Sequence, residues 1–226
     1  MQGYGSFCPI AKASEILAER WTLLVLRELL AGSRRFNDFR RGLPHVSPTL
    51  LSRRLKTLEA DGLIERRPGC KSGGWEYHPT KACEELGPIL QSIGHWGQRW
   101  VRSRLSPDEL HPGELMWYIM HHFVIDQLPQ LRVTIYVEFS DVRKMKRWWF
   151  VLENQKVDLC LQDPGHPIDI SIFTDLLTLT QIYMGEKSFS AAISLGKMTI
   201  DGSNSLTRHI WKWFGRSGFA PAERVA

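Results

Sequence analysis

The sequence lacks any long apolar run. No stretch approaches the roughly 18 apolar residues that a membrane-spanning helix needs. Its first residues, MQGYGSFCPIAKASEI, have no basic segment followed by an apolar core, so we expect neither a secretory signal nor a membrane partner. The four cysteines are scattered without a C-x-x-C pair. This argues against a disulfide framework or a structural zinc site and favours a reducing, cytoplasmic setting.

Catalytic motifs are also missing. The sequence has no G-x-S-x-G, no P-loop and no G-x-G-x-x-G, and no histidine can be paired with a nucleophile. His111, His121 and His122 could suggest a metal, but neighbours on a helix diverge by about 100°. We therefore expect no enzyme activity, no cofactor and no metal.

The positive charge is unevenly distributed. The whole chain of 226 residues has a net charge of +5, but residues 1–104 carry 17 Lys and Arg against 10 Asp and Glu, a net +7. The remainder is net −2. The stretch RLSPDELHPGE, from Arg104, holds two prolines and a glycine where this balance changes. The sequence predicts two domains, 1–105 and 106–226, and only the first is suited to a polyanion.

The stretch HVSPTLLSRRLKTLEADGLIERRP, residues 45–68, predicts a helix with two unlike faces. Ser47 followed by Pro48 is typical of an N-cap and a first helical residue. A buried face is predicted from leucines at i, i+4 and i+7, and Gly62 ends the helix. The side chains on the opposite, polar face are Thr49, Ser52, Arg53 and Lys56.

The surrounding pattern completes a recognisable order of elements. Helices are predicted from Cys8 to Ala18 and from Trp21 to Gly32, and a short one over RRFNDFRRGL. After the capped helix, LIERRP and WEYHPT predict a β-hairpin. A further helix is predicted from Lys81 towards Val101. Three helices, a hairpin and a final helix are typical of a winged helix-turn-helix.

Here the residues resemble a known family. CPI at Cys8, ERWTLLVLRELLAGSRRFNDFRRGLP from Glu19, SPTLLSRRLKTLEADGLIERR and YHPT resemble the HxlR-type winged-helix transcriptional regulators over about 95 residues. The resemblance implies a homodimer that binds double-stranded DNA, with the recognition helix at 47–60 and the wing at 64–77. It also implies that the helix after the wing contributes to the dimer. One departure is Cys83, where the family usually has glycine.

The basic face of 47–60 then has an expected partner. Arginine can bind guanine through two hydrogen bonds, and hydroxyls can meet base edges or phosphates. A charge run by itself is more often a solvated helix face, and acids such as Glu59, Asp61 and Glu65 could pair with some of these arginines. Arg54 lies nearer the buried face and is a weaker candidate. The predicted DNA-contacting residues are Thr49, Ser52, Arg53, Lys56, Arg66, Arg67, Lys71, Arg34 and Arg35.

The second half predicts an α+β domain, an antiparallel sheet covered by helices. LRVTIYVEF alternates apolar and polar side chains, as a half-buried strand does. RWWFVLEN, VDLCLQ and HPIDISIF predict further strands. TDLLTLTQIYMG predicts a helix capped by Thr174, MTIDG a strand and SNSLTRHIWKWFG one last helix, followed by a poorly ordered tail after Phe214.

DISIFTDLLTLTQIYMGEKSFSAAISLGKMTIDG is similar to the end of sterol-carrier-protein type domains. The resemblance covers about 70 to 100 residues and rests mostly on apolar and glycine positions. It implies an apolar tunnel for a small hydrophobic ligand, although such side chains are more often plain core. The predicted lining residues are Trp148, Phe150, Leu159, Leu176, Leu179, Tyr183 and Met184.

Two alternatives stay open at this stage. Cys8 matches the N-terminal cysteine through which some HxlR-type regulators sense oxidants, and Lys12 one turn later could lower its pKa slightly. A Cys-Pro helix start can also be purely structural. Alternatively, the second half is a lipid carrier or an acyl-handling enzyme that the first half only addresses to DNA.

Overall fold

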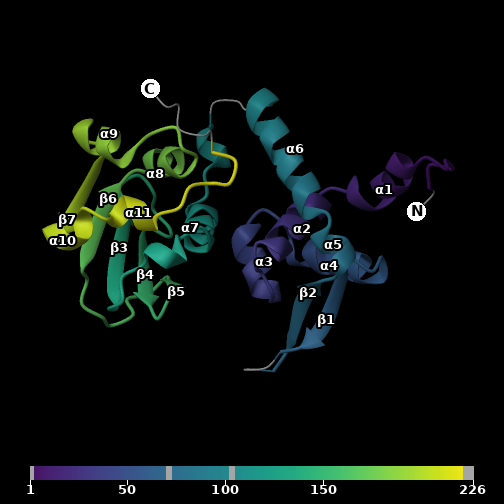
Figure 1. The fold of residues 1–226 in the computed structure, drawn as a ribbon, viewed down its shortest axis with the longest axis horizontal. Helices are drawn as coiled ribbons and strands as arrows, with labels where there is room; N and C mark the ends of the chain where they lie inside the picture. Colours follow the sequence, from purple (N-terminus) through teal and green to yellow (C-terminus); the bar gives the residue numbers. More distant parts are fainter. Residues whose placement is uncertain (1–2, 70–72, 102–104, 221–226) are drawn as a thin grey trace. The chain divides into compact units, whose positions relative to one another are not determined.

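The chain forms two compact units. The computed structural model describes residues 3–69, 73–101 and 105–220, and the chain divides after Arg102 into units 1–102 and 103–226 (Figure 1). No helix among the described residues is long and apolar enough to cross a membrane. Each unit has its own buried apolar core.

The first unit is a small helical bundle with a two-stranded hairpin (Figure 1). Its core contains Val25, Leu26 and Leu29 from the second helix and Phe39 from the third. The elements, in chain order, are α1 (Pro9–Leu17), α2 (Thr22–Leu30), α3 (Phe36–Gly42), α4 (Pro48–Ala60), β1 (Ile64–Pro68), β2 (Trp75–Pro79), α5 (Lys81–Glu84) and α6 (Gly87–Trp100).

Helix α4 forms as its sequence predicts. Ser47 Oγ accepts a hydrogen bond of 3.3 Å from the Leu50 amide, and Pro48 occupies the first helical position. Leu51, Leu55 and Leu58 are at most 1% exposed. Gly62 follows the helix with φ +73°, a conformation that favours glycine. These features fix where α4 begins, where it ends and which face it buries.

Helices α2 and α3 approach each other closely at Glu28 and Gly42. Glu28 is 1% exposed and accepts hydrogen bonds from Arg27 Nη2 at 3.0 Å and Ser33 Oγ at 3.4 Å. A Cβ atom at Gly42 of α3 would overlap the Glu28 carboxylate. Glycine at position 42 therefore lets α3 pack directly on a buried acid of α2.

The single helix expected from Lys81 to Val101 is two helices. The interruption falls at Glu85 and Leu86, ahead of Gly87 and Pro88. Pro88 has no amide hydrogen for the carbonyl four residues earlier, so the hydrogen-bond ladder of α5 cannot continue unbroken into α6.

The second unit is a mixed five-stranded sheet with helices (Figure 1). The strand order is β5-β4-β3-β6-β7. The elements, in chain order, are η1 (Pro107–Glu109), α7 (Pro112–His121), η2 (Ile125–Gln127), β3 (Val133–Phe139), β4 (Arg147–Glu153), β5 (Lys156–Cys160), β6 (Ile170–Thr174), α8 (Leu176–Tyr183), α9 (Phe189–Ser194), β7 (Met198–Gly202), α10 (Asn204–Thr207) and α11 (Ile210–Trp213).

The expected all-antiparallel sheet was wrong in one pairing. β3 and β6 run parallel, with Ile135 opposite Ile170. After the β4–β5 hairpin, residues 161–169 carry the chain from the β5 edge to the other side of β3. A crossover connection allows parallel pairing where a tight hairpin would not. One face of β3 and β4 packs into the core with α7, α8 and α11.

Three local expectations for the second unit were also wrong. The N-cap of α8 is Asp175, whose carboxylate accepts from the Thr178 amide at 2.7 Å, because Thr174 still belongs to β6. The single last helix is α10 and α11, separated at Arg208 and His209. The tail is packed as far as it is described, since the Ser217 amide donates to the Tyr183 carbonyl at 2.9 Å.

Candidate functional site

The exposed side of α4 forms a shallow concave surface. Thr49, Arg53 and Lys56 are exposed and Ser52 is half-buried. All four line this surface, so the structure brings the four predicted α4 residues together. Sequence reasoning missed the remaining members, although each lies on the same helical face. They are Pro48, Thr57 and Ala60.

Arg54 has a different position on the same helix. It is 7% exposed, its Nε donates to the Arg20 carbonyl at 3.0 Å, and its guanidinium pairs with Glu19. Arg54 therefore joins α4 to the segment before α2. Neighbouring arginines with unlike surroundings follow from the 100° turn per residue of a helix.

The hairpin β1–β2, here called the wing, sorts its charges onto two faces. In its register Arg66 lies opposite Tyr77, and Arg67 lies opposite Glu76. On one face the Arg66 guanidinium carbon lies 4.1 Å from the centroid of the Trp75 ring. On the other face Arg67 pairs with Glu65 at 2.6 Å. The two predicted wing arginines thus differ. Arg67 forms an ion pair with Glu65, whereas Arg66 packs on the indole ring of Trp75.

The Trp75 side chain is a feature that sequence reasoning passed over. It is 51% exposed. The signal in the sequence was Arg66, which lies two positions before Pro68, the cross-strand partner of Trp75. Diagonal neighbours on one face of a hairpin are within reach of long side chains.

The two arginines before α3 also make internal contacts. Arg34 Nη1 donates to the carbonyls of Leu29 at 2.7 Å and Ser33 at 3.0 Å. Arg35 lies 3.2 Å from a carboxylate oxygen of Glu76. These contacts tie the start of α3 to α2 and to the wing. Lys71 lies outside the described residues.

Helix α6 carries an exposed apolar stripe. Its members Ile89, Ile93, Trp96 and Trp100 recur at i, i+4, i+7 and i+11 and are 44–67% exposed. No residue of α6 is buried. A stripe at this spacing on one helix is typical of a surface that packs against another helix.

The comparisons with known proteins agree with this architecture. A family model described as HxlR-like helix-turn-helix matches residues 16–104. An uncharacterised HTH-type transcriptional regulator of Bacillus subtilis, YvaP, is 38% identical over 96 residues, covering 42% of this chain and 89% of that protein. The chain belongs to the HxlR family. It is therefore a DNA-binding transcriptional regulator.

Other similar proteins include a second regulator and a solved structure. An uncharacterised HTH-type regulator of Synechocystis, sll1512, is 33% identical over 111 residues, covering 49% of this chain and 82% of that protein. The reduced form of the transcriptional regulator YodB from Bacillus subtilis is 26% identical, with a TM-score of 0.37, covering 42% of this chain and 95% of that chain.

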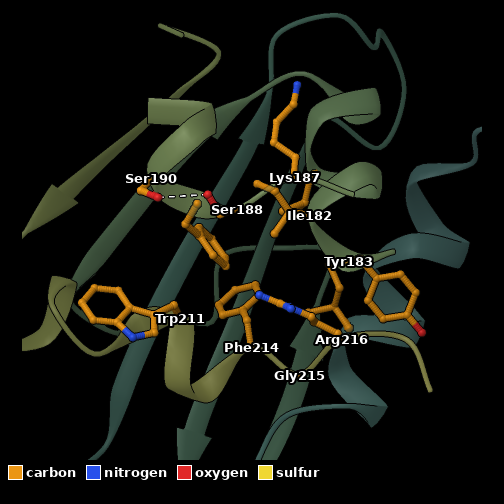
Figure 2. Close-up of a pocket in the computed structure, with 12 residues that line it drawn as sticks. Ile182, Tyr183, Lys187, Ser188, Ser190, Trp211, Phe214, Gly215 and Arg216 are labelled. Atoms are coloured by element: carbon orange, nitrogen blue, oxygen red, sulfur yellow. Dashed lines mark hydrogen bonds between the residues drawn. The ribbon is translucent and has the colours of Figure 1, made fainter. Parts of the chain in front are cut away.

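The second unit of this HxlR-family chain contains a cavity of about 390 Å³ (Figure 2). Of the seven residues predicted to line a pocket, Leu179 and Tyr183 line this one. The other five lie elsewhere. Trp148, Phe150 and Leu176 are buried in the core, and Leu159 and Met184 are partly buried against it.

The remaining cavity residues were not found from the sequence. Lys187 lies between α8 and α9, Phe189 is the first residue of α9, and Arg216 lies in the tail. No periodicity in the sequence marks these three positions as lining a cavity. These side chains come together only through tertiary packing, which cannot be predicted from a local sequence pattern.

The described cysteines have unlike surroundings. Cys8 is a half-buried free thiol at the N-cap of α1, and the Lys12 ammonium lies 3.1 Å from Glu15. Cys83 is fully buried, and burial raises its pKa to about 11. Burial also raises the pKa of Cys160.

The histidines considered for a metal have other contacts. His111 Nδ1 accepts from the Glu114 amide at 3.2 Å and caps α7. His122 Nδ1 lies 2.9 Å from the Tyr118 carbonyl oxygen and 3.2 Å from the Tyr183 hydroxyl. Among the described residues, no three His, Cys, Asp or Glu side chains gather as a metal site.

Proposed function

We propose that this regulator acts as a cytoplasmic homodimer that inserts α4 into the major groove. The observation that carries the proposal is the exposed face of α4, with Arg53 and Lys56 opposite the buried leucines. A helix is about 10–12 Å across and the groove about 12 Å wide, so the helix fits. Thr49, Ser52 and Arg53 then read base edges, and Lys56 lies toward a phosphate.

In this arrangement the wing contacts the DNA backbone through the face that carries Arg66. The guanidinium of Arg66 rests on Trp75, whereas Arg67 has Glu65 as a partner. Arg34 and Arg35 are proposed to contact phosphate along the same path. Arg34 already donates to two carbonyls, so we expect a weaker contribution from it than from Arg66. Lys71 remains a predicted phosphate contact.

The dimer is proposed to form through the apolar stripe of α6. Two copies of Trp96 and Trp100 would cover one another across a two-fold axis, which removes exposed indole surface from water. A two-fold dimer must place its recognition helices about 34–36 Å apart to engage two half-sites. Substitutions on α6 should therefore affect DNA binding without touching α4.

For the second unit, residues 106–226, we propose a sterol-carrier-like module that receives a small hydrophobic ligand and alters the spacing of the recognition helices. The cavity between helices and the glycine-rich strand–helix–strand order support this. A coupling of about 1–3 kcal/mol would suffice for a useful change in DNA affinity. In the rival view, a lipid carrier merely addressed to DNA, ligand binding would leave operator affinity unchanged.

A redox switch at Cys8 is the second candidate. The observation that favours it is a half-buried free thiol at the start of a helix. Loss of an oxidant response in Cys8→Ser, with the ligand response retained, would separate it from the ligand model.

The experiment that tests the proposed function is a footprint of the full chain over the gene's own upstream region at several salt concentrations. We expect two protected half-sites about one helical turn apart and a steep fall in binding as salt rises. The control is Lys156→Gln, an exposed lysine of β5 in the second unit. Protection of one half-site by a monomer, or binding indifferent to salt, would contradict the proposal.

A further inference from the structure

The cavity in the second unit (Figure 2) has an apolar floor, and polar side chains lie at its rim. The floor side chains Ile119, Leu179 and Ile182 are 1–5% exposed. At the rim lie Arg216, which is exposed, and Trp211, which is 52% exposed. A volume of about 390 Å³ is within the usual range for a small-molecule pocket. This arrangement suits a ligand with an apolar body and one polar end.

The charge of the lining has one sign. Its twelve residues include two cations, Lys187 and Arg216, and no Asp or Glu. In Figure 2 the Arg216 side chain extends from its backbone toward Phe214, whereas Lys187 extends away from the cavity. Arg216 is therefore the cation placed to meet a bound anion, and a guanidinium can hold a carboxylate through two parallel hydrogen bonds.

The backbone on both sides of Arg216 is fixed. The Ser217 amide donates to the Tyr183 carbonyl at 2.9 Å. A Cβ atom at Gly215 would overlap the His122 carbonyl, so this glycine permits a close approach of two backbones. Holding the residue before and the residue after Arg216 fixes the backbone from which its side chain extends.

The apolar wall is largely aromatic. Phe189 and Phe214 meet edge to face, with ring centroids 5.7 Å apart. Tyr183 and Trp211 also line the cavity. Aromatic side chains present ring edges and faces to a planar ring at favourable geometry, a gain that an alkyl chain does not obtain.

We propose that this cavity binds an aromatic carboxylate, with its ring against Phe189 and Phe214 and its carboxylate on Arg216. The inference rests on the proposed ligand-binding role of the second unit and gives that ligand a chemical class. It also assigns a role to the tail residues 215–217, because they supply both the cation and its backbone anchors.

The test is equilibrium dialysis of the full chain with 2-naphthoate, 2-naphthamide and octanoate. We expect 2-naphthoate to bind at least tenfold more tightly than the uncharged amide and than the alkyl carboxylate. Arg216→Gln should lower naphthoate affinity at least tenfold and leave naphthamide affinity unchanged. Lys187→Gln, which removes a rim cation that extends away from the cavity, is the matched control and should change affinity less than threefold.

Three outcomes would overturn the inference. Equal binding of naphthoate and naphthamide would show that Arg216 does not hold the carboxylate. Tighter binding of octanoate than of naphthoate would show that the ligand is not aromatic. If none of the three probes binds, the cavity is not a binding site for such ligands. Footprinting of Arg216→Gln without ligand separates these failures from a failure of DNA binding, because the proposed function predicts a normal footprint for that variant.

Discussion

Arg66 and Trp75 lie together on one face of the wing, with 4.1 Å between the guanidinium carbon and the ring centroid. Arg67, the next residue, turns to the other face and pairs with Glu65. An arginine that already has an acidic partner gains less from a phosphate, because the new contact replaces an existing one. The two arginines are therefore a matched pair for testing which face of the wing meets DNA.

We predict that Arg66→Ala lowers operator affinity about tenfold, about 1.4 kcal/mol. The slope of log affinity against log salt should become shallower by about one. Arg67→Ala should change affinity less than threefold. Filter binding or fluorescence anisotropy at four salt concentrations measures both quantities. A larger loss for Arg67→Ala than for Arg66→Ala would reverse the assignment of the two faces.

Trp75 should act on DNA binding through Arg66. A cation–π contact at an exposed site contributes about 0.5–1 kcal/mol, so Trp75→Ala should weaken binding about twofold to fivefold. Trp75→Phe should restore part of that loss, since a phenyl ring keeps the contact. The decisive readout is a double-mutant cycle. Once Arg66 is alanine, Trp75→Ala should have no further effect on affinity, and an additive loss would show an independent role.

Arg53 should read a base, in contrast to the wing. Arg53→Ala is expected to relax preference at one position of each half-site by about 1–3 kcal/mol. Selection from a randomised operator library, compared between the native chain and the variant, measures this directly. Lys56→Ala is the control on the same face and should weaken all operators alike. A uniform loss in Arg53→Ala would instead place that arginine on a phosphate.

The sequence predicted the parts of the candidate site that depend on local periodicity. Leu51, Leu55 and Leu58 follow helical spacing, so the opposite face of α4 could be assigned from the printed residues. The Arg66–Trp75 contact depends on the register of two strands across a turn, and Arg34 donates to the Leu29 carbonyl of a helix that ended four residues earlier. Spacing along the chain does not report such contacts.

The second unit was less predictable for the same reason. Its strands were located from alternation, but the parallel pairing of β3 with β6 depends on where residues 161–169 cross. Pocket residues chosen by apolar character were mostly core, because Trp148 and Phe150 point from the sheet into the packed layer. The cavity instead uses residues from helix ends and from the tail, which carry no periodic signal.

Gly42 should be intolerant of a side chain. A methyl group there would overlap the Glu28 carboxylate, which is buried and hydrogen-bonded to Arg27 and Ser33. We expect Gly42→Ala to lower the free energy of unfolding by about 1–3 kcal/mol. Gly87→Ala is the control, because nothing lies within 4 Å of its added Cβ. Urea unfolding followed by circular dichroism measures both, and a stable Gly42→Ala would show that α2 and α3 separate easily.

Cys83 should make the first unit less stable in alkali. Its pKa is raised by burial from 9.0 to about 11, so the folded state keeps the thiol protonated where the unfolded chain ionises. The stabilisation is complete below pH 9 and is lost as pH rises through about 11, with a total of about 2.7 kcal/mol at most. Cys83→Ala should flatten the fall in unfolding free energy between pH 8.5 and pH 11, roughly the window these values define. Tyr77, whose pKa is also raised by burial, stays in both proteins, so the difference between their pH profiles isolates Cys83. Parallel profiles for the two proteins would mean that the thiol of Cys83 ionises as readily in the folded chain as in the unfolded one.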